Sequence, residues 1–192
     1  EFTGAVLLCV AFYAAPGFST PLYYYQKDAL VLSDQDIGWL SALNCLGGIL
    51  GALCYPAICR RLNLGALLVA GILTYVGCML LYLAYQGWVS ALVLEPLAGF
   101  LLVLGVLPLQ HLVVRVSPAG SGALGYALLL GLGNAAVALS DVFGAQLMAH
   151  FDLGLPSMIW IAAVSSAATL LLVPRLPTEL LRERERSPGE SA

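Results

Sequence analysis

Charged side chains are scarce in this sequence of 192 residues. Only 10% of the residues are Asp, Glu, Lys or Arg, whereas 60% are apolar, and the mean hydropathy is +0.92. A soluble domain of average composition carries about 25% charged residues. The composition therefore argues against a water-soluble globule, because too little polar surface is available to cover one. The net charge of −3 gives no reason to expect a nucleic acid partner.

The residue spacings of metal, redox and catalytic sites are also missing. The five cysteines form no CxxC pair, no nearby histidine completes a zinc site, and no HExxH occurs. A rhomboid-type protease needs Gly-x-Ser-Gly, whereas residues 119–122 are Ala-Gly-Ser-Gly. The chain lacks a glycine-rich phosphate loop with lysine, and its two histidines lie too far apart for a haem or quinone pair. We therefore expect no enzyme, metal or other cofactor.

The beginning of the chain does not have the pattern of a secretory signal. No basic segment precedes the first apolar run, and no small-residue cleavage site leads into a soluble domain. The chain starts at Glu1 rather than at Met and enters the apolar run at once. We expect it to be a piece of a longer protein.

Six apolar runs are each long enough to cross a membrane, which takes about 20 residues. They cover residues 2–25, 37–59, 64–85, 88–114, 122–150 and 156–173. The breaks between them carry charge or turn residues, and Ser33 and Asp36 have the spacing of a capping box before the second run. We predict an all-α, six-helix transmembrane domain over residues 1–174. A polar tail with a short frayed helix follows over residues 175–192.

Prolines and small residues suggest how the predicted helices bend and pack. Kinks are expected in the first helix at Pro16 and Pro21 and in the fourth at Pro96 and Pro108. Small residues spaced by four predict close helix–helix contact on the second and fifth helices. These residues are Gly47, Gly48, Gly51 and Ala52 on the second helix and Gly131, Ala135 and Ala138 on the fifth.

Basic residues are distributed unequally between the two ends of the predicted helices. Successive breaks alternate sides, so one side holds Arg60, Arg61, Arg115, Arg175, Arg182, Arg184 and Arg186. The other side holds only Lys27. The positive-inside rule then predicts a cytoplasmic C-terminus. Trp88 and the tyrosines at positions 23–25 would lie at the outer interface.

Two acidic residues, Glu95 and Asp141, lie deep within the predicted spans. At 1.5 Å per residue, Glu95 and Asn44 lie about 10 Å, and Asp141 roughly 14 Å, from the outer ends of their helices. Asn134 lies two turns before Asp141 on the same face. Buried ionisable residues are costly and usually functional, so this polar layer predicts a water-filled cavity. The alternative is a protonated, hydrogen-bonded carboxyl with a purely structural role. The third and sixth helices carry little polarity and are expected to face lipid or to support the bundle.

Two stretches resemble a known superfamily. Residues 51–65, with Gly51 and the pair Arg60-Arg61, are similar to the cytoplasmic loop motif of the major facilitator superfamily where it recurs in the second half, although the motif's acidic residue is missing. Residues 15–28, Ala-Pro-Gly-Phe-Ser-Thr-Pro-Leu-Tyr-Tyr-Tyr-Gln-Lys-Asp, and the following segment to Gly38 look like the seventh-helix region of the folate-biopterin transporter family.

The resemblance implies that the chain forms helices seven to twelve of a transporter with a 3+3 inverted repeat. Its partners would be the lipid bilayer, a small-molecule substrate and an N-terminal six-helix half. Secondary active transport by alternating access would follow, with proton symport through Glu95 or Asp141. Asn44 and Asn134 would face the same cavity.

The substrate and the role of the aromatic residues stay open. Tyr23, Tyr24 and Gln26 would contact a planar ring such as a pterin, or the tyrosines would form only an interfacial belt. No Lys or Arg lies deep in the predicted helices, so the carboxylates of a folate would need a cation from the other half. The alternatives are another facilitator, such as a drug exporter or sugar carrier, and a six-helix structural membrane protein without a cavity.

Overall fold

The protein is all-helical in the residues that the structure, a computed structural model, describes, namely 2–117 and 122–182. Five helices, two with 3-10 extensions, are long and apolar enough to cross a membrane. They are α3 (Asp34–Cys59), α4 (Leu64–Leu81) with η2 (Tyr82–Ala84), α5 (Trp88–Val116), α6 (Gly122–Phe151), and α7 (Leu155–Ala168) with η3 (Thr169–Arg175). This content shows a multi-pass membrane protein. A short helix, α8 (Thr178–Arg182), follows.

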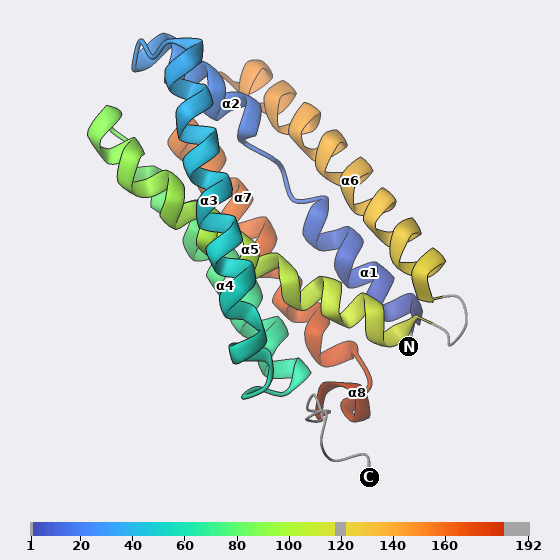
Figure 1. The fold of residues 1–192 in the computed structure, drawn as a ribbon. Coiled ribbons are helices and arrows are strands. Elements are labelled where there is room, and N and C mark those ends of the chain that lie inside the picture. Colours follow the sequence, from blue (N-terminus) through green and yellow to red (C-terminus); the bar gives the residue numbers. More distant parts are fainter. Residues whose placement is uncertain (1, 118–121, 183–192) are drawn as a thin grey trace.

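The first predicted span is not one continuous helix, and that part of the prediction was wrong. It is divided into α1 (Phe2–Tyr13), α2 (Ser19–Tyr24) and the π-helical η1 (Tyr25–Ala29), with a non-helical link at residues 14–18. Figure 1 shows this link between two blue helical segments beside α6. Pro16 explains the break rather than a mere kink, because it lacks an N–H and disfavours helical geometry in the residue before it. The backbone N–H of Gly17 donates instead to the carbonyl of Ser140 on α6, at 3.1 Å.

The capping box that the sequence predicts before the second span is confirmed. The Ser33 hydroxyl accepts a hydrogen bond from the backbone N–H of Asp36 at 3.2 Å, and the Asp36 carboxylate accepts one from the backbone N–H of Ser33 at 3.1 Å. These bonds satisfy two donors that a helix start otherwise leaves free. Helix α3 therefore begins at Asp34, before the apolar run itself begins at Ile37.

Helices α3 and α5 approach each other closely through glycine. A Cβ atom at Gly47 would overlap the carbonyl oxygen of Pro96, and one at Gly99 would overlap the carbonyl oxygen of Asn44. At Gly51 the added atom would come within 2.7 Å of the Phe100 carbonyl oxygen. The small-residue prediction is therefore confirmed on the second predicted helix at Gly47 and Gly51.

On the fifth predicted helix, α6, other small residues make the contact. A Cβ atom at Gly131 would meet nothing within 4 Å, and Ala135 and Ala138 are exposed. The prediction was wrong here because it used spacing alone. Contact is made instead at Gly133, which lies against Tyr13, and at Gly144, where a Cβ would overlap the carbonyl oxygen of Gly17.

The largest apolar core joins α1, α4 and α5 with the end of the chain. Its fully buried members include Leu8, Phe12, Leu68, Ile72 and Leu112. Helix α7 packs on α4. In the most apolar 18-residue stretch of each of these two spans, 39% of the residues are buried within the protein, compared with 22% in α3 and 18% in α6. Within this chain α4 is therefore central, so of the two expectations for this helix, facing lipid or supporting the bundle, the structure agrees with the second. Helices α3 and α6 leave the most apolar surface uncovered.

The turns of the chain fall at two opposite ends of the bundle (Figure 1). The start of α1, the turn at residues 60–63 and α8 lie at one end, and η1 lies at the other. The turn at residues 60–63 and α8 therefore share an end, as the alternation of breaks requires. Arg184 and Arg186 lie outside the described residues.

The cytoplasmic placement of this end stays a prediction that a reporter can test. A fluorescent protein fused to the C-terminus of the full-length protein is expected to stay accessible to protease in inverted vesicles and to be protected in right-side-out vesicles. The physical reason is the excess of arginine at this end. The opposite protection pattern would contradict the orientation.

Candidate functional site

A cavity of about 430 Å³ lies between α2, α3, α4, α5 and α6 and reaches the link at residues 14–18. Its volume falls within the range of roughly 300–1,000 Å³ that is usual for small-molecule sites. The structure brings five of the predicted site residues to its walls, namely Tyr23, Gln26, Asn44, Glu95 and Asp141. The predicted polar layer of three helices is therefore a shared cavity wall.

Glu95 of α5 is 5% exposed and accepts hydrogen bonds at both carboxylate oxygens. Asn44 donates to Oε2 at 2.9 Å and Tyr82 does so at 3.3 Å. Tyr85 donates to Oε1 at 3.2 Å, and the Gln26 amide lies 3.5 Å from the same atom. All four partners are neutral donors, so the Glu95 carboxylate is held firmly but meets no opposite charge.

Three local features position these donors. The glycine contact between α3 and α5 brings Asn44 so close that its amide also donates to the Glu95 carbonyl, at 3.2 Å. The 3-10 turn at the end of α4 presents Tyr82 and Tyr85, whose rings stack at 5.8 Å. The π-helical η1 buries Gln26, whose amide donates to the Tyr85 hydroxyl at 2.6 Å. The network thus depends on four separate segments.

The carboxylate of Asp141 on α6 accepts hydrogen bonds from the first residues of α2. Its Oδ1 accepts from the backbone N–H groups of Ser19 at 3.0 Å and Thr20 at 3.2 Å, and its Oδ2 accepts from the Thr20 hydroxyl at 2.6 Å. Helix α2 has no cap from its own N-cap residue, Phe18. Asp141 therefore does what an N-cap side chain does, but from a residue more than 120 positions away in the sequence.

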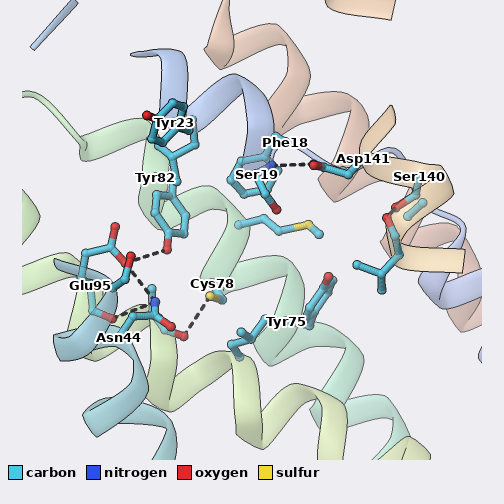
Figure 2. Close-up of a pocket in the computed structure, with 18 of the residues that line it drawn as sticks. Phe18, Ser19, Tyr23, Asn44, Tyr75, Cys78, Tyr82, Glu95, Ser140 and Asp141 are labelled. Atoms are coloured by element: carbon cyan, nitrogen blue, oxygen red, sulfur yellow. Dashed lines mark hydrogen bonds between the residues drawn. The ribbon is translucent and has the colours of Figure 1, made fainter. Parts of the chain in front are cut away.

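An aromatic contact links the two carboxyl groups across the cavity. Phe18, next to the α2 segment that Asp141 holds, packs edge-on against Tyr82 with ring centroids 5.5 Å apart. Tyr82 in turn donates to Glu95. Figure 2 shows Glu95 with Asn44 on one side of this view and Asp141 on the other, with the Tyr82 and Phe18 rings between them.

The structure does not bring Asn134 or Tyr24 to this cavity. Asn134 is exposed and borders a separate, smaller cavity of about 160 Å³, together with Cys9, Gln110 and Tyr126. Tyr24 is 56% exposed and touches neither cavity. A helix turns by 100° per residue, so tyrosines that are adjacent in sequence point in different directions. Their clustering in the sequence therefore does not mean that they share a cavity wall.

Tyr23 and Gln26 line the cavity but are engaged by other groups. The Tyr23 hydroxyl donates to Asp34 at 3.1 Å and accepts from Lys27 at 3.3 Å. Lys27 and Asp34 form an exposed ion pair at 2.8 Å, and the hydrogen bonds to Asp34 and Tyr23 raise the pKa of Lys27. Gln26 is bound into the Glu95 network. Its role here is to hold Glu95, rather than to present an amide free for a ring.

The predicted loop motif splits into a packing residue and a turn. Gly51 is buried against α5, where its lack of a side chain permits the close approach. Arg60 and Arg61 follow the end of α3 and are exposed. Asn63 then caps α4 by accepting from the backbone N–H of Ala66 at 2.8 Å.

Several cavity residues were missed from the sequence. Phe18, Cys45, Tyr75, Cys78 and Tyr82 all line the cavity. A usable signal was present, because residues 75, 78 and 82 are spaced as one face of a helix. The tyrosines near the end of α4 were passed over because they lie where aromatic residues of a membrane interface are common.

Removing the hydrogen bonds that Asp141 accepts from Ser19 and Thr20 is expected to weaken the attachment of α2 to α6. In Asp141→Ala the N–H groups of Ser19 and Thr20 lose their acceptor, which should destabilise the fold by about 1 kcal/mol. Hydrogen exchange over residues 17–24 should accelerate, because α2 is then held mainly by packing. Val142→Ala, an exposed neighbour on the same helix, is the matched control. Equal hydrogen-exchange rates over residues 17–24 in both variants would show that the Asp141 hydrogen bonds do not hold α2 in place.

Comparison of this chain with protein-family models, with curated proteins and with solved structures finds no match. The inference of function therefore rests on the cavity, on the two carboxyl groups at its walls and on the interrupted first span.

Proposed function

We propose that this chain is one six-helix half of a secondary active transporter with the major facilitator fold, and that it moves a small organic solute. The observation that carries the proposal is the cavity of about 430 Å³ with Glu95 and Asp141 at its walls. A bundle with only a structural role has no reason to keep two carboxyl groups beside a hollow at membrane depth. The resemblance of residues 15–28 makes a pterin or a folate the first solutes to test.

The interrupted first span supports this proposal. In this proposal α1 and α2 together make a sixth crossing, which adds to the five long apolar helices. Helices interrupted at membrane depth are a recurring device of transporters, because the freed backbone groups there line a cavity. The link at residues 14–18 follows this pattern, since Ala15, Pro16 and Gly17 border the cavity.

A second six-helix half is the partner that the proposal requires. Helices α3 and α6, which flank the cavity, expose large apolar side chains. Those on α3 include Leu46, Ile49, Leu50 and Leu53, and those on α6 include Leu128, Leu132, Leu139, Val142 and Phe143. Contact with the second half would cover part of this surface and close the cavity, and rocking of the two halves would open it to either side in turn.

The Glu95 network supports the proposal of proton coupling. A protonated carboxyl must donate a hydrogen bond, but the amide groups of Asn44 and Gln26 that face Glu95 are donors. To accept it, a tyrosine hydroxyl such as that of Tyr82 must rotate, or one of the two amides must flip to present its oxygen. Protonation of Glu95 would therefore rearrange contacts among α3, α4 and η1, which is how a proton would change the packing around a bound solute.

Cys45 tests whether the cavity contains water. This cysteine is exposed on α3 and lines the cavity, whereas Cys54 is exposed on the same helix outside it. In single-cysteine variants of the full-length protein in membranes, a water-soluble thiol reagent is expected to modify Cys45 at least tenfold faster than Cys54. A bundle without a cavity would leave both cysteines unmodified.

Uptake tests the transport proposal directly. The full-length protein is reconstituted in liposomes, and entry of radiolabelled biopterin, folate and benzyltrimethylammonium is measured with an inward proton gradient. Saturable uptake of at least one solute, abolished when the gradient is removed, is expected. No uptake of any of the three by a protein whose Cys45 is accessible would contradict transport of these solute classes.

A further inference from the structure

The charged groups that line the cavity indicate the class of solute that it binds. Its described lining residues include two carboxyl groups, Glu95 and Asp141, and none of them is Lys, Arg or His. The hydrogen bonds to both carboxyl groups come from amides, hydroxyls and backbone N–H groups. Neither carboxyl group takes part in an ion pair in the described chain, where Lys27 of η1 pairs instead with Asp34 at the start of α3. The described residues of this chain therefore supply no positive charge to the cavity.

Aromatic rings supply a second, independent observation. Five of them line the same cavity, from Tyr13, Phe18, Tyr23, Tyr75 and Tyr82. The face of an aromatic ring attracts a cation within about 6 Å of its centre and does not attract an anion. Phe18 and Tyr82 pack together between the segments that carry the two carboxyl groups (Figure 2). The rings thus lie where a cation between the carboxyl groups would touch them.

We propose that the cavity binds an organic cation, meaning an amine or quaternary ammonium group attached to an apolar or aromatic body. This inference rests on the proposed transport function, but it concerns what binds. The cation supplies the charge that the walls lack, and its apolar body fits among Met79, Leu102 and Val137. An anion such as a folate would bring carboxylates to a wall that already carries two carboxyl groups and has no cation to receive them.

Three probes with the same ring and different charge test the proposal. They are benzyltrimethylammonium, benzyl alcohol and benzoate. Their binding to the full-length protein is measured by protection of Cys45, which lines the cavity, against uncharged N-ethylmaleimide, with the other cysteines replaced. The cation should protect at a concentration at least tenfold lower than the alcohol, and benzoate should not protect. This measurement does not depend on transport.

Two carboxyl variants and one matched control complete the test. Glu95→Gln and Asp141→Asn are each expected to raise the protecting concentration of the cation at least tenfold, because each removes a negative charge that attracts the cation. The protecting concentration of benzyl alcohol should stay within about twofold, because the alcohol carries no charge. Asp28→Asn, at an exposed residue of η1, should change neither concentration. If Glu95→Gln fails to fold, Asp141→Asn still provides the result.

The outcomes separate the cation proposal from the transport proposal. Protection by the cation without its uptake into liposomes would support the binding inference and contradict transport. Uptake of folate or biopterin together with protection by benzoate would support transport and overturn the cation inference. Equal protection by all three probes, or by none although Cys45 reacts, would also overturn it.

Discussion

Replacing Gly99 by alanine is expected to disrupt the contact between α3 and α5 severely, as is alanine at Gly47 on the facing helix. The new Cβ would overlap the carbonyl oxygen of Asn44, and both atoms belong to helix backbones that cannot rotate away. The helices must separate, with a loss of stability of about 3 kcal/mol, at the upper end of the usual range for overpacking. Thermal unfolding of the purified protein in detergent measures the loss.

The two exposed glycines of the neighbouring helices are the controls for Gly99. A Cβ at Gly38 on α3 or at Gly77 on α4 would meet nothing within 4 Å. Alanine at either position should be neutral or slightly stabilising, because glycine is a poor helix former. If Gly99→Ala unfolds at the same temperature as Gly77→Ala, the close approach of α3 and α5 is not a feature of the protein in solution.

The same substitution should also impair the site. Asn44 reaches Glu95 because Gly47 and Gly99 let the two backbones touch, so separating the helices lengthens the bond from the Asn44 amide to Oε2, now 2.9 Å. The variant should therefore lose solute uptake at temperatures at which it is still folded. Uptake equal to that of the wild type in the folded variant would show that this bond is not needed.

Neutralising Glu95 is the second change with a large expected effect. In Glu95→Gln one side-chain oxygen replaces two, while the four donors remain, and the new amide N–H₂ faces two other amides. Uptake of whichever probe the wild type carries, driven by a proton gradient, should fall at least tenfold. A buried donor left without an acceptor costs about 1–3 kcal/mol, so a lower unfolding temperature is also expected.

A comparison of substitutions separates coupling from stability. Asn44→Ala removes the donor to Oε2 and leaves the carboxyl group in place. It should lower the unfolding temperature and reduce uptake, but the uptake that remains should still depend on the proton gradient. Asp28→Asn should change neither quantity. The coupling hypothesis fails if Glu95→Gln and Asp141→Asn both retain full gradient-driven uptake.

Parts of the site follow from the sequence because the relevant patterns are local. Asn44 and Glu95 each lie seven residues into their predicted spans from the same end, so the rise of a helix puts them at equal depth. Glycines spaced by four mark the contact that joins them. These two patterns predict a shared layer for Asn44 and Glu95, and the structure adds the hydrogen bond between them, at 2.9 Å.

Other parts of the site could not be obtained this way. Gln26 lies in a segment that the sequence placed at the outer interface, yet it is 5% exposed, because η1 folds back toward Tyr85 and Glu95. Tyr82 lies on a helix whose composition suggested a support in lipid. In both cases the residue's role depends on a neighbour that is distant in sequence, and the composition of a segment does not show which distant residues pack against it.

The sequence by itself determined that this is an all-helical, multi-pass membrane protein, because hydropathy and turn residues act within single segments. It also determined which acids lie at membrane depth. The tertiary structure alone decided what those acids do. Pro16 predicts a distortion of the first span. The conformation of the break at residues 14–18 depends on Ser140 and Asp141 of α6, which accept hydrogen bonds from the backbone N–H groups of Gly17 and Ser19. A freed backbone N–H needs an acceptor, and only the packing of α6 against that link places one there.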